Sequence, residues 1–160
     1  MSWLADKIEQ WPTGKLLPYA RNARTHSEDQ VAQIAASIAE FGFTNPILAG
    51  SDGIIVAGHG RLAAAQKLGL ERVPVVVLDH LSQTQRRALV IADNRIAENA
   101  GWDDAMLRIE LEALQLEGFD QDITGFDADA LAELIAGDEP DNEGQSDEDA
   151  VNYQDRKSVV

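Results

Sequence analysis

The chain has 160 residues and no cysteine, which excludes disulfide bonds, thiolate zinc sites and thiol catalysis. No apolar run approaches the roughly 18 residues that a membrane span needs, and the N-terminus lacks the basic-then-apolar order of a signal peptide. We therefore expect a soluble, cytoplasmic protein with no membrane partner, of a length that suits one domain with a buried core.

The formal net charge of -15 is concentrated at the carboxyl end of the chain. Residues 1–116 carry 11 lysines and arginines against 14 acidic residues, whereas residues 117–160 carry 2 against 14. An acidic tail of this kind can repel DNA, mimic DNA or keep a protein soluble. The body of the chain is nearly neutral, so the total charge does not describe it.

Short strands and helices alternate along the chain without a long βαβ run, which predicts a compact α+β core with added C-terminal helices. In chain order we expect an edge strand and covering loop in 1–26, a helix from the Ser27 cap to Gly42 with Gln30 in a capping box, and a hairpin of 46–49 and 54–57. These are followed by a helix from Arg61 to near Gly69, a buried strand over 73–78 and a helix opened by the Ser82–Gln85 capping box. Two further helices are expected, from 103 or 104 to about 116 and from 127 to about 136. The apolar run 88–92 is expected to be buried nearly all round. Beyond Gly137 the composition predicts disorder.

Residues 54–69 are the most informative stretch, because a β-branched run ends there in the Gly58-His59-Gly60-Arg61 turn and an Ala-rich helix follows. Glycines let a ligand approach the backbone closely, and a helix N-terminus offers unpaired N–H groups and a positive dipole end. With an arginine in the first turn, this construction is typical of a phosphate-binding site. A tight strand-to-helix connection with a surface arginine fits the same pattern.

Further polar clusters interrupt the apolar pattern at Asn22 and Arg24 and again at Asp93 and Asn94. The guanidinium groups of Arg24 and Arg61 can each fork onto a phosphate. Asp93 and Asn94 offer hard oxygen ligands of the kind that suit Mg²⁺, which favours a carboxylate together with substrate phosphates. These clusters predict a site for a nucleoside triphosphate with Mg²⁺, and helix caps with solvated charge are the alternative interpretation.

Six motifs follow one another within residues 7–100: Asn22-x-Arg24, Ser37-Ile38-x-x-x-Gly42, Pro46-Ile47, Gly58-x-x-Arg61-x-x-Ala64, Gly69 and Val73-Pro74-Val75. In this order they resemble the N-terminal domain of ParB-type proteins, a family that shares its fold with sulfiredoxin. Residues 12–135 are also similar to the ParB-like segment found ahead of some bacterial and phage DNA methyltransferases, through the Asn-Ala-Arg-Thr-His-Ser and Ala-Gly-His-Gly-Arg strings. The resemblance implies a small mixed sheet with packed helices.

The resemblance also implies roles for individual residues. In partition proteins of this family, the arginines that match Arg24 and Arg61 hold the triphosphate of CTP, and the acidic-amide pair that matches Asp93 and Asn94 holds Mg²⁺. The expected ligand is therefore Mg²⁺ with CTP or ATP. The expected phosphate-binding residues are Asn22, Arg24, Thr25, Gly58, His59, Gly60 and Arg61, and the expected metal ligands are Asp93 and Asn94.

This chain departs from the family pattern at the turn, where His59 and Gly60 stand in place of the glutamate and first arginine of Gly-Glu-Arg-Arg. The missing arginine argues against CTP hydrolysis and clamp switching, and the missing glutamate argues against the family's free-serine kinase activity. Sulfiredoxins need a cysteine at the position of His59, so sulfinic acid reduction is excluded. His59 can act as an acid or base, contact a phosphate while protonated, or hydrogen-bond the turn. With Asp93 it is the candidate for any catalytic role.

Contact with DNA is assigned to Arg86, Arg87 and Arg95, which are expected to face outward on the polar side of one helix. Three charges on a nearly neutral body predict weak, salt-sensitive binding. No helix-turn-helix pair with a basic recognition helix is visible, so sequence-specific reading of DNA is expected to need another domain or partner.

The leading hypothesis is a ParB-like nucleotide-binding module in DNA metabolism, acting as a regulatory or targeting domain linked to DNA modification or partition. A DNA methyltransferase and a second copy of the chain are its candidate protein partners. The first alternative is an enzyme, a metal-dependent nuclease or phosphohydrolase that uses Asp93 and His59. The second is a protein-interaction domain whose nucleotide site is dead. The expected divisions are a nucleotide-binding core in 1–100, a helical extension in 101–137 and an acidic tail or linker in 138–160.

Overall fold

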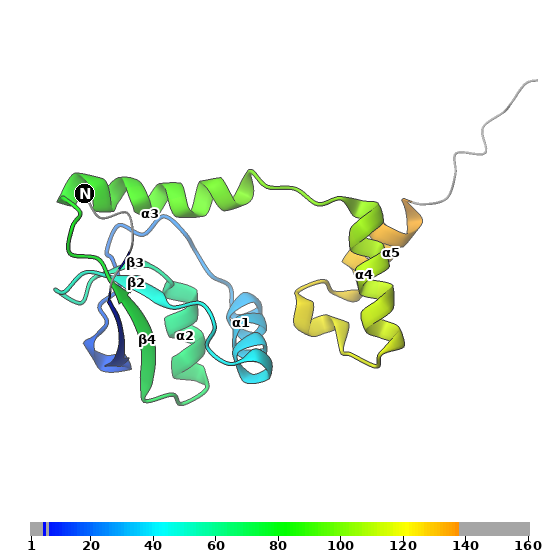
Figure 1. Cartoon of the computed structure of the whole chain (residues 1–160), viewed down its shortest axis with the longest axis horizontal. Coiled ribbons are helices and arrows are strands. Elements are labelled where there is room, and N and C mark those ends of the chain that lie inside the picture. The colour runs from blue at the N-terminus through cyan, green and yellow to red at the C-terminus, as the bar shows by residue number, and fades with distance from the viewer. Residues whose placement is uncertain (1–4, 6, 138–160) are drawn as a thin grey trace, which may run out of the picture.

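The structure is a computed structural model that describes residue 5 and residues 7–137 (Figure 1). Its elements are, in chain order, β1 (Ile8–Pro12), η1 (Thr13–Lys15), α1 (Glu28–Phe41), β2 (Ile47–Ala49), β3 (Ile55–Ala57), α2 (His59–Lys67), β4 (Arg72–Val77), α3 (Gln83–Glu98), α4 (Asp104–Leu116), η2 (Gln121–Thr124) and α5 (Ala128–Ala136). The strands form one sheet in the order β1-β4-β2-β3, with β4 antiparallel to β1 and parallel to β2. The predicted α+β class with a small mixed sheet is confirmed.

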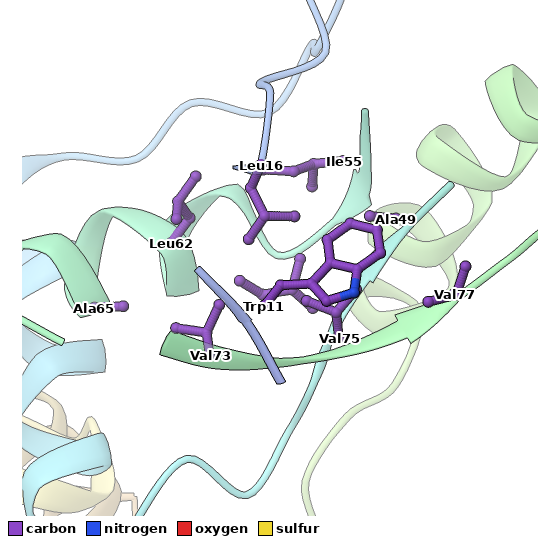
Figure 2. Packing of buried hydrophobic residues seen from close by; sticks show 10 residues of the cluster. Trp11, Leu16, Ala49, Ile55, Leu62, Ala65, Val73, Val75 and Val77 are labelled. Carbon is purple, nitrogen blue, oxygen red and sulfur yellow. The ribbon is translucent and has the colours of Figure 1, made fainter. Parts of the chain in front are cut away.

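The two faces of the sheet bury different residues because side chains alternate along each strand. On one face, Val73 and Val75 of β4 pack with Leu62 of α2, and Figure 2 shows the indole of Trp11 beside Ala49 and Val75. The other face is covered by α3 and forms a smaller cluster. Its members are Val56, Leu78 and Val90, with Tyr19, Leu48, Val76, Leu81 and Leu89 packed against them. The sheet therefore separates α2 from α3.

The helix starts follow the predicted caps with two differences. Ser27 accepts a hydrogen bond from the backbone N–H of Gln30, as expected, but the Gln30 side chain lies 3.0 Å from Nδ1 of His26 and forms no capping box. Helix α2 begins at His59 rather than at the predicted Arg61, with Gly58 as its N-cap at φ +108°. The turn is therefore a single left-handed glycine, and the two residues after it already belong to the helix.

The expectation that residues 88–92 are buried nearly all round is wrong. Val90 is buried, but Ile91 is 66% exposed and Ile96, one and a half turns later, is 68% exposed. The helix contacts the sheet mainly at β3, and Ile91 and Ile96 lie outside the apolar cluster that Val90 joins. None of the helices described is long and apolar enough to cross a membrane.

The two predicted C-terminal helices are confirmed as α4 and α5, which pack together beside the core in Figure 1. Element η2 joins this pair to α1, and the rings of Phe41 and Phe119 stack with centroids 6.1 Å apart. The disorder predicted beyond Gly137 concerns residues outside those described. The predicted division near residue 100 remains a prediction.

Candidate functional site

The start of α2 presents free backbone donors at the mouth of a small cavity. In any α-helix the first N–H groups have no partner within the helix, and the first such bond of α2 runs from Leu62 N–H to the carbonyl of Gly58. The N–H groups of His59, Gly60 and Arg61 precede it. Gly58 supplies the positive φ that lets β3 run directly into the helix. Strand β3 thus leads directly into the N-terminus of α2, where the positive end of the helix dipole is available to an anion.

The side chain of Arg61 is held beside the start of α2 by one hydrogen bond, and another of its donors is unused. Its Nη2 donates to the carbonyl of Pro46 at 3.0 Å, whereas its buried Nε has no hydrogen-bond partner. Burial lowers the pKa of Arg61, and the charge of Asp93 acts in the opposite direction. A guanidinium remains charged under these conditions, so a buried positive charge with an unsatisfied donor lies at the site. An anionic ligand would satisfy both.

His59 hydrogen-bonds a loop that is distant in sequence. Its Nε2 lies 3.1 Å from the backbone nitrogen of Tyr19 and accepts that N–H. An accepting Nε2 requires a neutral ring with its proton on Nδ1. Burial, and after it the charge of His26, lower the pKa of His59. Of the three roles considered for His59, this geometry favours a hydrogen bond that holds the loop carrying Asn22 and Arg24 against α2.

A cavity of about 100 Å³, called here the turn cavity, lies between the start of α2, the loop before α1 and α3. Eight of the predicted site residues line it: Asn22, Arg24, Gly58, His59, Gly60, Arg61, Asp93 and Asn94. Thr25 is not among its lining residues. The three separate sequence clusters therefore meet in space. The phosphate-binding and metal roles assigned to them remain predictions.

The two candidate metal ligands have different surroundings. Asn94 donates its side-chain amide to the carbonyl of Val90 at 2.8 Å, which leaves its amide oxygen as the acceptor that a cation would use. Asp93 is the only carboxylate lining the turn cavity. Among the described residues no group of three or more His, Cys, Asp or Glu side chains is arranged to hold a metal. This donor set fits Mg²⁺ that takes most of its ligands from phosphates and water, and does not form a complete protein cage.

A second and larger cavity of about 410 Å³, called here the arginine cavity, adjoins the turn cavity and shares Asn22, Arg24 and Asn94 with it. Two of the three predicted DNA-facing residues, Arg87 and Arg95, line this cavity. The expectation that Arg86 faces outward is wrong. Its guanidinium forms two hydrogen bonds to the Asp52 carboxylate, at 2.9 and 3.1 Å, and its side chain is 13% exposed. This ion pair fastens α3 to the β2–β3 turn.

Three residues with polar side chains in the arginine cavity were not predicted as site residues: Tyr19, Arg21 and Glu98. Arg21 stands three residues before Arg24 in the same polar loop, a spacing that offered a signal. Glu98 lies three residues after Arg95 on α3 and makes an ion pair with it at 3.3 Å. The contact of Glu98 with Arg24, at 2.5 Å, spans 74 residues, and no local pattern indicates such a contact.

Comparison with solved structures first defines the class of fold. The C-terminally truncated chromosome-partitioning protein ParB from Caulobacter crescentus, solved with CTP-gamma-S, superimposes with a TM-score of 0.61 at 22% identity, covering 82% of this chain and 86% of that one. Sulfiredoxin from Arabidopsis thaliana matches less well, with a TM-score of 0.45 at 27% identity over 52% of this chain and 97% of that one. The model of the ParB N-terminal domain matches residues 5–95, and the chain belongs to this family.

Two relatives show how much of other proteins the chain spans. The ParB-like nuclease domain-containing protein YnaK of Escherichia coli K12 is 52% identical over 81 residues, which are 51% of this chain and 93% of that protein. The probable chromosome 2-partitioning protein ParB of Deinococcus radiodurans is 36% identical over 117 residues, 70% of this chain and 40% of the relative. The chain therefore spans nearly all of the first relative and less than half of the second.

The model of the ParB-methyltransferase HTH domain matches residues 105–159. The helices of this segment are predictable from its sequence, but the motif is not, because a helix-turn-helix is ordinarily marked by a basic recognition helix. Residues 105–137 carry one basic residue, Arg108, against eight acidic ones. The described part of the segment therefore lacks the positive charge that contact with DNA phosphates requires.

Proposed function

We propose that the chain is a nucleotide-binding module of the ParB family that takes a nucleoside triphosphate with Mg²⁺ at the turn cavity. The observation that carries this proposal is the buried guanidinium of Arg61, whose Nε has no partner, beside the free N–H groups at the start of α2. A phosphate would accept from both and would oppose a charge that burial disfavours. The ParB of C. crescentus was solved with a CTP analogue, which makes CTP the first nucleotide to test.

Each residue has a defined task in this proposal. Arg24 and Arg61 pair with phosphate oxygens, while Asn22 stabilises its own loop through two hydrogen bonds with the backbone of Arg24. Asp93 and the amide oxygen of Asn94 hold Mg²⁺, which bridges to the phosphates and offsets their charge. The turn cavity is too small for a whole nucleotide, since ligand pockets usually measure about 300 Å³ or more. The nucleoside therefore extends beyond it.

In biological terms the module acts as a regulatory or targeting unit in DNA modification or partition. Its match to a ParB-methyltransferase HTH model supports a methyltransferase as partner, and a nucleotide-dependent homodimer belongs to the same proposal. The nuclease alternative has less support. Asp93 is the single carboxylate of the turn cavity, and the accepting nitrogen of His59 is already bonded to Tyr19. Two-metal hydrolysis ordinarily uses several carboxylates.

Calorimetric titration of CTP, ATP and GTP, with and without Mg²⁺, tests the proposal. We expect CTP with Mg²⁺ to bind, Arg24→Ala and Arg61→Lys to weaken it tenfold or more, and Asp93→Asn to remove the dependence on Mg²⁺. Lys67→Ala, which deletes an exposed charge at the far end of α2, is the control and should bind normally. Circular dichroism checks that each variant is folded. Absence of heat with all three nucleotides in the folded wild type would refute the proposal.

A further inference from the structure

The arginine cavity is unusually cationic for a protein with this net charge. Two arginines reach it from the loop before α1, namely Arg21 and Arg24, and two from α3, namely Arg87 and Arg95. Glu98 is the only acidic residue that lines it. Four guanidinium groups from two segments thus converge on one cavity with a single compensating carboxylate. Such a concentration of like charge costs free energy unless an anion is bound there.

The position of Glu98 shows that an anion fits between these arginines. One carboxylate oxygen lies 2.5 Å from Nη1 of Arg24, and the other lies 3.3 Å from Nη1 of Arg95. Arginines bind a phosphate in the same way, with two guanidinium groups that donate to two oxygens of one anion. In the described part of the chain, no hydrogen bond or ion pair engages the side chains of Arg21 and Arg87. The chain's own carboxylate therefore occupies an anion position that has spare donors around it.

We propose that the arginine cavity is a second anion site, which binds the phosphate of a nucleotide unit, and that Glu98 competes with that phosphate for Arg24 and Arg95. The site goes beyond the proposed triphosphate site, although the two share Arg24. The ligand chemistry is a phosphate ester of a nucleoside, and its source is either a single-stranded nucleic acid or a free mononucleotide.

The rest of the cavity wall supports a nucleotide unit rather than a bare phosphate. The volume of about 410 Å³ far exceeds what one phosphate fills, and Tyr19, Val90 and Ile91 give it an apolar side. Ile91 is 66% exposed, so a base can reach that side from solvent. Proteins that bind single strands combine a cationic groove for the backbone with aromatic or apolar surfaces for the bases. The arginine cavity has both components. In this proposal Arg87 and Arg95 contact the nucleic acid within the cavity.

The competition by Glu98 makes the proposal testable with a charge-matched control. A fluorescein-labelled oligothymidylate of about eight nucleotides and unlabelled dTMP are titrated in EDTA without any nucleoside triphosphate, and anisotropy is read at several salt concentrations. Glu98→Gln is compared with Glu110→Gln, which removes the same charge from an exposed position on α4 outside the cavity. We expect Glu98→Gln to tighten oligonucleotide binding about threefold to fivefold relative to the control. Arg87→Gln and Arg95→Gln should weaken it about threefold to tenfold and lower the salt slope by about one.

Each outcome decides the proposal. Binding of the oligonucleotide with the expected order of variants supports a single strand as source, and binding of dTMP at similar strength supports a free nucleotide. Unchanged or weaker binding by Glu98→Gln, relative to Glu110→Gln, overturns the competition. If neither the oligonucleotide nor dTMP binds to the wild type or to Glu98→Gln, the proposed site is overturned. Arg61 lines the turn cavity and not the arginine cavity, so we expect Arg61→Lys to bind the oligonucleotide as the wild type does, whether or not the turn cavity binds a triphosphate. The two proposals are therefore tested separately.

Discussion

Replacing His59 by glutamine tests whether the turn is held to the Tyr19 loop by a neutral imidazole. Nε2 of His59 accepts the Tyr19 N–H at 3.1 Å, and a protonated ring cannot accept it. Glutamine keeps an acceptor of similar reach that does not titrate. The change therefore separates the hydrogen bond itself from its dependence on pH.

The direction of the effect follows from the pKa. Burial and the neighbouring His26 lower the pKa of His59 in the folded protein. Above the unfolded value of about 6.5 the neutral ring contributes its full stabilisation, which is then lost as the pH falls toward the folded pKa. The charged groups that face the ring across the turn cavity are His26, Arg61, Arg24 and Asp93. The positive charges among them add to the cost of protonating His59, and the carboxylate of Asp93 opposes that cost.

The hydrogen bond between His59 and Tyr19 determines how large the change in the free energy of unfolding should be. A partly buried bond of this kind contributes about 1 kcal/mol, and leaving the Tyr19 N–H without a partner costs about 1–3 kcal/mol. Urea unfolding followed by circular dichroism at about pH 7.5 and about pH 5.5 measures the change. We expect the wild type to lose about 1 kcal/mol more than His59→Gln between these conditions, and His59→Ala to be less stable than both at the higher pH.

The control for this experiment is His80→Gln, because His80 is exposed in the loop after β4 and does not line the turn cavity. If His59→Gln lost stability between the two conditions as steeply as the wild type, the dependence would belong to another group. The assignment of His59 as a neutral hydrogen-bond acceptor would then be refuted.

Two further substitutions test the frame around the site. Gly58→Ala should lower the free energy of unfolding in urea by about 1–3 kcal/mol, because φ is +108° there and a Cβ would lie 3.0 Å from Nη2 of Arg61. Gly14→Ala meets nothing within 4 Å and should change it by less than about 0.5 kcal/mol, so equal effects would contradict the strain. Asp52→Asn should cost about 1 kcal/mol at neutral pH, because the half-exposed Asp52 pairs with both terminal nitrogens of Arg86. Since Arg86 holds the pKa of Asp52 below its usual value, this difference should shrink in thermal melts as the pH falls below that value, and a constant difference would exclude the ion pair as its cause.

Local sequence patterns predicted most of the elements because their causes are local. The Ser82 cap with Gln85 was recognisable from four residues, and the buried strand β4 from the continuous apolar run 73–78. The start of α2 was placed two residues late because two glycines suggested a longer turn. Of these two glycines, Gly58 has a positive φ and Gly60 lies in the first turn of the helix. A glycine in a helix interior has a packing reason that the sequence alone does not reveal.

The parts of the site were predictable from residue types, which also suggested that they form one site, and the family resemblance supported that combination. Nothing local indicates that Arg24 and Asp93 meet at Arg61, since the loop, the turn and α3 are separated by dozens of residues. The same limit explains the errors on α3. The Arg86–Asp52 pair depends on how the β2–β3 turn approaches the helix, and Ile91 is exposed because none of the elements described in 7–137 covers it. An apolar run specifies a preference for burial but not the partner that provides it.

The departure of this turn from Gly-Glu-Arg-Arg has a physical counterpart at Gly60. A Cβ at this position would lie 2.9 Å from Cδ1 of Ile34 and 3.0 Å from both Cε1 and Nδ1 of His26. The imidazole of His26, held beside Gln30, therefore occupies the space into which a longer side chain at position 60 would extend. Arginine at position 60 would require His26 to leave. The backbone donors of the turn do not depend on that side chain, so the pairing of Gly60 with His26 keeps those donors while it excludes a second guanidinium beside Arg61. This arrangement supports the proposal that the turn binds phosphate without hydrolysing it.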